Sequence, residues 1–432
     1  MSRLAQQVDA AHKQNVSRST PEFAAFGPII EQHATDAAFL WLLRSQVVYN
    51  STLYLQEDID ELDQRINGHL DGLLAAGQLG WEICLQQLEM EDAGEAFVAA
   101  VIAFNSGDTA KMKTVCNTTQ EHPEMIPGLV SALGWINETT AQPWIDRFLG
   151  VKDPRYHYLG VATCSLRRLD PGQVLTNLLQ HDDIDQHSQL YARCLRLVGE
   201  MKRVDLVPAL NQAMNAEDKD VKFWACWSAA LLGNKAAIEQ LKPYVLEENE
   251  HQNAALQIVC NSLSIEQARQ WIAEISKDPA NLRIVIQAAG IIGETQVIPW
   301  LIKQMHDPLV ARIAGLAFTM MTGVDLEQSQ LDKEVEIEFE DNPEGEIEDD
   351  AEHDDSDLPW PDPIKLRSFW DKNEQTYQAG ERYFLGDIIG SDTLKGALQN
   401  GNQLQRSTAA IKLAVLESNE IVLNTATPGI KF

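Results

Sequence analysis

The chain has 432 residues, of which 44% are hydrophobic, so it can bury a substantial core. Its formal net charge of −30 excludes a general role in nucleic-acid binding, because proteins that bind phosphates carry clustered lysine and arginine. Its six cysteines form no CxxC pair, so we expect reduced thiols in a reducing compartment.

The N-terminal part of the sequence is predicted to form helices, none of which would cross a membrane. We expect residues 1–27 to form a loosely ordered lead-in, without a secretory signal, and residues 28–109 to form an N-terminal helical cap. The most apolar stretch, residues 37–43, closes on Arg44 and is far shorter than the roughly 20 residues that cross a membrane. We therefore expect a protein of the cytoplasm with no membrane insertion.

Residues 110–323 repeat a helical pattern with a nearly constant period. Small-residue-rich helices are predicted to end at Gly134, Leu169, Gly199, Gly233, Ser262, Gly293 and Gly323. The spacing averages about 31 residues, which is typical of an α-solenoid, in which each helical pair packs against its neighbours. Four cysteines recur at nearly the same spacing, and we expect them on the first helix of successive repeats: Cys164, Cys194, Cys226 and Cys260.

Two local motifs mark these repeats. Residues 278–283 and 307–312 both read D-P-x-x-x-R, in which the aspartate can cap a helix and the proline suits its first turn. Second helices carry an early proline, at Pro143, Pro208 and Pro299. With these motifs in register, the chain resembles the HEAT-repeat family. The expected fold is therefore an all-α, HEAT-like solenoid of helical hairpins.

An acidic insertion is predicted at residues 324–363. Between Asp325 and Asp362 there are 18 acidic residues and one basic residue, Lys333, a density that favours a solvated segment. The segment would act as a solubilising spacer or attract a partner with a basic surface. Within it Val335, Ile337 and Phe339 alternate with acidic residues, so this stretch either adds a strand to a partner or stays disordered.

Residues 364–432 are expected to form a C-terminal helical unit, with a turn at residues 380–386. The candidate partner-binding residues are aromatic or lie in the insertion. Trp144, Trp271 and Trp300 on second helices either pack in the core or anchor a partner, and Trp360 between two prolines is a candidate exposed anchor. The full set is Trp144, Trp271, Trp300, Val335, Ile337, Phe339 and Trp360.

No catalytic, cofactor or metal motif stands out, so we predict a non-enzymatic protein with no cofactor. His181 and His187 share a polar loop with three aspartates, which is either a solvated loop or a site for a divalent cation.

The two ends of the chain carry a narrower resemblance. Residues 37–44, 62–73, 358–363, 380–386 and 403–406 are similar to an uncharacterised family of bacterial HEAT-repeat proteins, often encoded near type VI secretion components. That resemblance implies an accessory role in secretion, as adaptor or chaperone for cargo or spike loading. We expect a protein-binding scaffold of the bacterial cytoplasm. The alternatives are a HEAT-like enzyme of the bilin-lyase type and an immunity protein that binds a basic toxin through the insertion.

Overall fold

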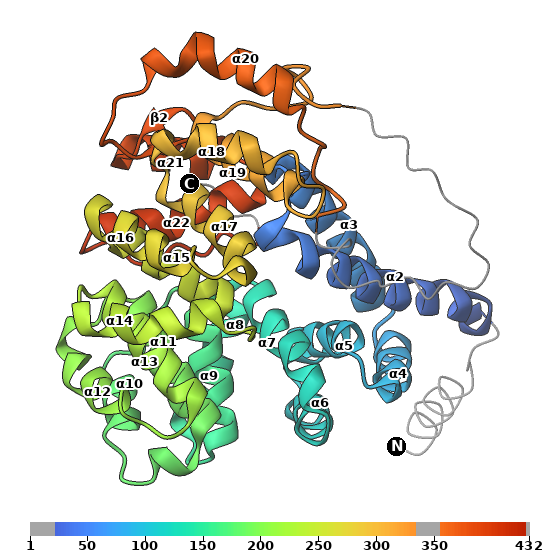
Figure 1. The fold of residues 1–432 in the computed structure, drawn as a ribbon. Helices are drawn as coiled ribbons and strands as arrows, with labels where there is room; N and C mark the ends of the chain where they lie inside the picture. Colours follow the sequence, from blue (N-terminus) through green and yellow to red (C-terminus); the bar gives the residue numbers. More distant parts are fainter. Residues whose placement is uncertain (1–21, 334–354, 429–432) are drawn as a thin grey trace, which may run out of the picture. The chain divides into compact units, whose positions relative to one another are not determined.

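The computed structural model describes residues 22–333 and 355–428, and its regular structure is almost entirely helical (Figure 1), which confirms the predicted all-α class. The internal contacts divide the chain into two units. One holds the residues up to Arg44 together with Glu61–Ala141, and the other holds Ser45–Asp60 and the residues from Gln142 onward. Within the described ranges, no helix is both long enough and apolar enough to cross a membrane.

The first unit is centred on α5. Its elements, of which α2, α3 and α8 run on into the second unit, are α2 (Glu22–Asn50), α3 (Gln56–Ala75), α4 (Gln78–Gln87), η1 (Leu88–Met90), α5 (Ala93–Ser106), α6 (Thr109–Glu121), η2 (Pro123–Met125), α7 (Ile126–Trp135) and α8 (Glu138–Gly150). Phe97 of α5 is fully buried, and its ring stacks on Trp41 at 5.2 Å and meets Trp135 edge-on at 5.3 Å. These aromatic contacts join α2, α5 and α7 into one core.

The second unit contains the repeats. A layer of first helices, each in contact with the next, comprises α9 (Pro154–Arg167), α11 (Ser188–Glu200), α13 (Lys219–Leu231), α15 (Gln252–Ser262), α17 (Leu282–Ile292) and α19 (Ala311–Thr322). The second helices are α10 (Gln173–Leu179), α12 (Val207–Ala213), α14 (Lys235–Leu246), α16 (Ile265–Ile275), α18 (Ile298–Gln304) and α20 (Pro363–Asn373). Short 3₁₀ turns join several of them, namely η3 (Ile184–Gln186), η4 (Val204–Leu206), η5 (Pro279–Asn281), η6 (Thr295–Val297) and η7 (Glu374–Thr376).

The predicted ends of the first helices agree with the structure to within about two residues, which confirms a HEAT-like solenoid. Gly293 and Gly323 cap α17 and α19 in the left-handed conformation that favours glycine. Gly199 plays another part, because α11 continues to Glu200 and a Cβ on Gly199 would lie 2.7 Å from the Cα of Ser228. Here glycine permits close approach of α11 and α13.

The cysteines lie where the spacing predicted them. Cys164, Cys194, Cys226 and Cys260 are on α9, α11, α13 and α15, and each is buried with a free thiol. Burial raises the pKa of all four thiols, that of Cys226 to about 11 and that of Cys260 to about 12. These thiols are therefore neutral packing groups.

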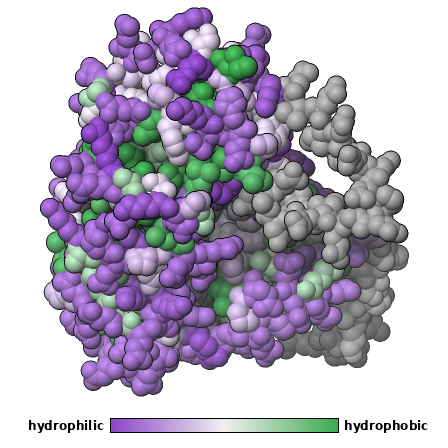
Figure 2. Space-filling view, in the orientation of Figure 1, coloured by the Kyte–Doolittle hydropathy of each residue, from purple (hydrophilic) through white to green (hydrophobic). Residues whose placement is uncertain are grey.

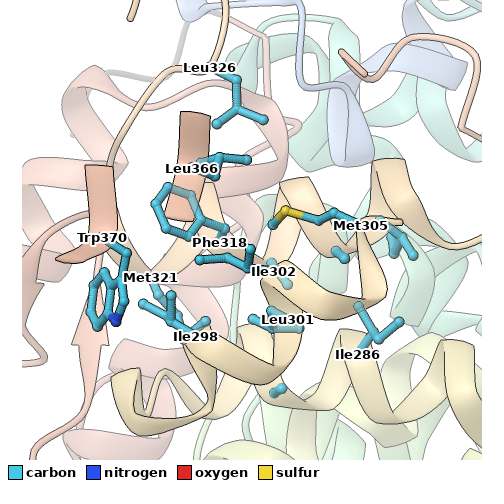
Figure 3. Close-up of a cluster of buried hydrophobic side chains, with 14 of the residues drawn as sticks. Ile286, Ile298, Leu301, Ile302, Met305, Phe318, Met321, Leu326, Leu366 and Trp370 are labelled. Atoms are coloured by element: carbon cyan, nitrogen blue, oxygen red, sulfur yellow. The ribbon is translucent and has the colours of Figure 1, made fainter. Parts of the chain in front are cut away.

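The helix pairs continue across the acidic insertion. Figure 3 shows α20 packing on α18 and α19, with Leu366 and Trp370 facing Ile298 and Phe318 in one hydrophobic cluster. The two ends of the insertion pair with each other: the amide of Lys333 donates to the carbonyl of Trp360 at 2.9 Å, and that of Asp362 to Leu331 at 2.8 Å. Residues 334–354 between them are outside the described part.

After α20 the chain turns back along the array. The turn expected at residues 380–386 belongs to a hairpin of β1 (Tyr383–Phe384) and β2 (Asp387–Ile388), because Leu385 and Gly386 both take the positive φ of a tight hairpin turn. The last two helices are α21 (Ser391–Asn400) and α22 (Gln403–Leu416). We call residues 380–427 the return segment.

The return segment binds the C-terminal ends of successive first helices. Near its start the amide of Tyr383 donates to Gly293 O at 2.7 Å, at the end of α17, and the amide of Leu385 donates to Met320 O at 2.9 Å, in the last turn of α19. It finishes at the α9 end, where Asn424 Nδ2 donates to Leu166 O at 2.8 Å. The last carbonyls of a helix have no partner within it, so these bonds satisfy groups that the helices leave open.

Two buried lysines extend this pattern. Lys412 of α22 donates to Ile291 O, at the end of α17, and to Asn261 Oδ1 at 2.8 Å. Lys202, just after α11, donates to Ala414 O at 2.6 Å and to Leu231 O at 2.7 Å. A cation near the negative end of a helix is favourable, although burial lowers the pKa of Lys202 to about 8.

Candidate functional site

Two adjoining cavities lie in the second unit, between the layer of first helices and α22. They share Asn50, Asn253, Gln257, Leu404 and Thr408 in their walls, so together they form one groove. Figure 2 shows hydrophilic side chains over most of the visible face, with hydrophobic ones gathered where α17 to α19 lie. The walls of the groove contain both polar and apolar residues.

The smaller cavity, of about 240 Å³, we call the arginine cavity. Its charged lining residues are Arg168 at the end of α9 and Arg193, Arg196 and Glu200 on α11. The three residues of α11 are spaced i, i+3 and i+7, which places them on one face of that helix, where they face the cavity.

Glu200 is enclosed by this arginine cluster. Its side chain is 1% exposed, it accepts from Arg196 Nε at 2.8 Å and from the hydroxyl of Ser165, and it lies 3.4 Å from Arg168 Nη1. Burial alone would raise its pKa, but the surrounding guanidinium groups outweigh burial and hold the pKa of Glu200 at about 2. Burial, together with the charge of Arg196, lowers the pKa of Arg193.

Tryptophan side chains form another wall of the arginine cavity. The guanidinium of Arg196 lies 4.5 Å from the ring centre of Trp224, and Trp224 meets Trp227 edge-on at 5.4 Å. Trp224 also contacts His251, which stacks on Phe223 at 4.0 Å. This stack fixes Trp224 and, through it, the orientation of Arg196.

The larger cavity, of about 370 Å³, we call the insertion-end cavity. Asp355, the first residue of the insertion that is described after residues 334–354, lines it and binds both arginines of the D-P-x-x-x-R motifs. Arg283 holds its carboxylate at 2.8 and 2.5 Å, and Arg312 Nη1 donates to its carbonyl at 2.8 Å. The repeat arginines thus hold the end of the insertion against α17 and α19.

The structure places the predicted partner-binding residues in different surroundings. Trp144 and Trp271 are 5% and 6% exposed, and Trp300 packs against the cluster of Figure 3. Trp360 is partly exposed and covered on one face by Arg312, 4.3 Å from its ring centre. Val335, Ile337 and Phe339 lie outside the described residues. The four tryptophans, which the structure describes, do not line the groove, and the role of all seven residues in binding a partner stays a prediction.

Two groups in the described part bring three potential metal ligands within 4.8 Å of one another. They are Glu91 with His122 and Glu124, and Asp220 with Glu250 and His251. The acidic residues of both groups are exposed. His181 of the predicted loop hydrogen-bonds to Asp183.

Sequence reasoning missed the arginine cavity. The available signal was the i, i+3, i+7 spacing of charged residues on α11, a helix whose other faces are apolar. Nothing in the sequence shows that the residues from Val422 to Thr425, more than 200 positions later, close the same cavity.

Comparison with known families supports the reading of the repeats. A family model described as HEAT repeats matches residues 172–260, which span α10 to α15 and carry the arginine-bearing helix α11. No curated protein and no solved structure matches the chain. The matched residues are similar to HEAT repeats, and the contacts between successive first helices continue beyond them to α19.

Proposed function

We propose that this HEAT-repeat chain is a protein-binding scaffold and that a segment of its partner lies in the groove formed by the arginine cavity and the insertion-end cavity. The observation that carries the proposal is the continuity of the groove. Side chains from α9, α11, α13, α15, α17 and α19 all line it, so it follows the repeats. HEAT repeats typically present such extended surfaces to polypeptides.

The chemistry of the groove supports a polypeptide ligand. Asn253 and Gln257 lie one helical turn apart on α15, and Gln287 lies on α17, the next first helix. The amides of all three can both donate to and accept from peptide groups. The same cavity wall also contains the buried apolar residues Leu256 and Ile291. A wall with both amide and apolar groups suits an extended polypeptide.

The more specific proposal is an accessory role in type VI secretion, as a cytoplasmic adaptor or chaperone for cargo or spike loading. It is supported by the resemblance of the two ends of the chain to bacterial HEAT-repeat proteins often encoded near such systems. The acidic insertion would attract a partner with a basic surface, since 17 of the 30 net negative charges lie between Asp325 and Asp362.

Site-specific photocrosslinking in the organism that encodes the chain tests the scaffold. We would place p-benzoylphenylalanine at Asn253, which is exposed in the groove, and at Glu239 of α14, which is exposed but lines neither cavity. A defined protein crosslinked from position 253 and absent from position 239 is the expected result. Equal crosslinking from both positions, or none from 253, would refute the groove as the binding surface.

The identity of the crosslinked protein tests the secretion proposal. A cargo or spike component supports it, and a partner unrelated to secretion contradicts it while leaving the scaffold intact. Repeating the experiment with residues 334–354 replaced by a neutral Gly-Ser linker measures the share of the insertion in recruitment. At low ionic strength we expect the linker variant to crosslink less partner than the wild type does. In high salt the difference between the two chains should be smaller.

A further inference from the structure

We propose that the arginine cavity binds a carboxylate group carried by a polypeptide. This inference deepens the proposed function, because it names the group of the partner that the cavity recognises, an acidic side chain or a free C-terminus.

The charge of the cavity is the first argument. Three guanidinium groups and one carboxylate line it, which leaves a local excess of two positive charges in a chain of net charge −30. The single carboxylate, Glu200, is buried beneath the arginines, whereas the side chain of Arg196 is 36% exposed. A ligand entering the cavity therefore meets arginine first.

The hydrogen-bonding capacity of the arginines is the second argument. Arg168 is used internally, since it donates to Ser165 O and to Val422 O. Arg196 uses Nε on Glu200, and its two terminal nitrogens make no hydrogen bond to any described residue. Arg193 makes one long bond, 3.3 Å from Nη2 to Ala162 O, and its Nε has no partner there. Arg193 and Arg196 thus keep donors for a ligand.

The orientation of Arg196 is the third argument. The indole of Trp224 lies against the guanidinium and Glu200 fixes its Nε, so the fork of terminal nitrogens is held in place before a ligand arrives. A planar fork of two N–H donors matches the two oxygens of a carboxylate. Preorganisation of this kind lowers the entropic cost of binding.

The remaining walls favour a carboxylate on a peptide over inorganic phosphate. Trp227, Ala254 and Leu404 give apolar surface suited to the methylene stem of a side chain. Gln257 Oε1 is an acceptor with no hydrogen-bond partner among the described residues, and an acceptor repels an anion but suits a peptide N–H. A cavity of about 240 Å³ has room for one such side chain.

Fluorine NMR of the full chain labelled with 5-fluorotryptophan tests the proposal, with the Trp224 resonance assigned from a Trp224→Phe variant. Four probes are titrated at low ionic strength: the N-acetylated amide of Ala-Glu-Ala, the same peptide with glutamine in place of glutamate, the glutamine peptide with a free C-terminal carboxylate, and inorganic phosphate.

We expect the glutamate peptide to shift the Trp224 resonance saturably and the neutral glutamine amide to leave it unchanged. Saturation by the glutamine peptide with a free C-terminus assigns the cavity to terminal carboxylates as well, and its failure restricts the cavity to side chains. Equal binding of the glutamate and glutamine amides, tighter binding of phosphate, or no saturable shift with either carboxylate peptide would overturn the proposal.

Two substitutions locate the binding group. Arg196→Gln should lower the affinity for the glutamate peptide about tenfold or more, the factor expected when a charge-assisted pair of hydrogen bonds from the guanidinium fork is lost. Arg196→Lys keeps the charge without the fork, so its affinity for the glutamate peptide should lie between those of Arg196→Gln and the wild type. If Arg196→Gln does not fold, the affinity of Arg196→Lys alone tests whether Arg196 binds the carboxylate. Arg155→Gln, on the exposed start of α9, is the matched control and should bind like wild type.

The outcome is separable from that of the photocrosslinking experiment. Carboxylate binding without a crosslinked partner would leave the cavity assigned and the scaffold proposal refuted. A partner crosslinked from position 253 without carboxylate binding would leave the scaffold standing and the present inference refuted.

Discussion

Arg283 and Asp355 form a bidentate ion pair across 72 residues of sequence, with Nη1 to Oδ2 at 2.8 Å and Nη2 to Oδ1 at 2.5 Å. The pair joins α17 to the C-terminal part of the acidic insertion. Since Arg312 also donates to the carbonyl of Asp355, two successive repeats hold the same residue.

The first prediction concerns this pair. Asp355→Ala should lower the free energy of unfolding by about 2 kcal/mol, because Asp355 is 8% exposed and the substitution removes the carboxylate that binds the partly buried guanidinium of Arg283, while the carbonyl that accepts from Arg312 remains. Urea unfolding followed by far-UV circular dichroism measures the loss. The control is Asp357→Ala, at an exposed residue of the same cavity wall, which should change stability by less than about 0.5 kcal/mol. Equal effects of the two substitutions would mean that the ion pair does not anchor the insertion.

Much of the fold was predictable because the repeats are periodic. A helix that packs on its neighbours in every unit must put a small residue at the same place each time, so the spacing of Cys164, Cys194 and Cys226 locates three first helices directly. Capping is also local, and Asp278 accepts from the amide of Ala280 at 3.0 Å, as the D-P-x-x-x-R motif predicts.

Contacts between residues that are far apart along the chain could not be predicted from the sequence. The arginines of the two motifs were recognised, but not their common partner Asp355, since no local rule relates residues so far apart. The same holds for the return segment: α22 was predicted as a helix, yet its place against the ends of α15 and α17 depends on Lys412 reaching Asn261 and Ile291. The groove exists only because of this return.

The second prediction is a stability that rises with pH through Lys412. Burial, reinforced by the charge of Arg382, lowers the pKa of Lys412 to about 7, whereas an unfolded lysine titrates near about 10.4. Between these values the unfolded chain binds the proton that the folded chain has released. This group therefore adds up to about 1.4 kcal/mol of unfolding free energy per pH unit.

Lys412→Met removes this dependence, so the stability of the variant relative to wild type should fall steadily from pH 7 to pH 9.5. Urea unfolding at three pH values across that range gives the difference. Lys395→Met changes an exposed residue of α21, and its free energy of unfolding should change with pH as that of the wild type does. A constant difference between Lys412→Met and wild type would show that Lys412 titrates as an ordinary lysine.

The third prediction concerns Glu200, whose pKa of about 2 lies below the ordinary value of about 4.3. A lowered carboxyl pKa contributes stability that is complete above the unfolded pKa and is lost as the pH falls toward 2. Glu200→Gln should therefore cost about 3 kcal/mol at pH 7, and the cost should shrink to roughly half by pH 3.

Urea unfolding of the variant and the wild type at pH 7 and at pH 3 tests whether the stability cost of Glu200→Gln becomes smaller at low pH. Glu239→Gln, at an exposed residue of α14, is the control, and its stability should differ little from that of the wild type at either pH. A cost for Glu200→Gln that is the same at both pH values would point to lost packing instead of lost charge pairing.

The fourth prediction tests the close packing of the first helices. A Cβ on Gly199 would stand 2.4 Å from Ser228 Oγ and 2.7 Å from Ser228 Cα, and because Ser228 Oγ also donates to Leu195 O at 2.7 Å, neither atom can move freely. Gly199→Ala should therefore destabilise the chain by about 1–3 kcal/mol through overpacking. Gly396→Ala, inside α21 with nothing within 4 Å of the added Cβ, should instead stabilise it by about 0.5–1 kcal/mol, since alanine loses less backbone entropy. The melting temperatures of the two variants should thus move in opposite directions, and a rise for Gly199→Ala would mean that α11 and α13 have room to separate.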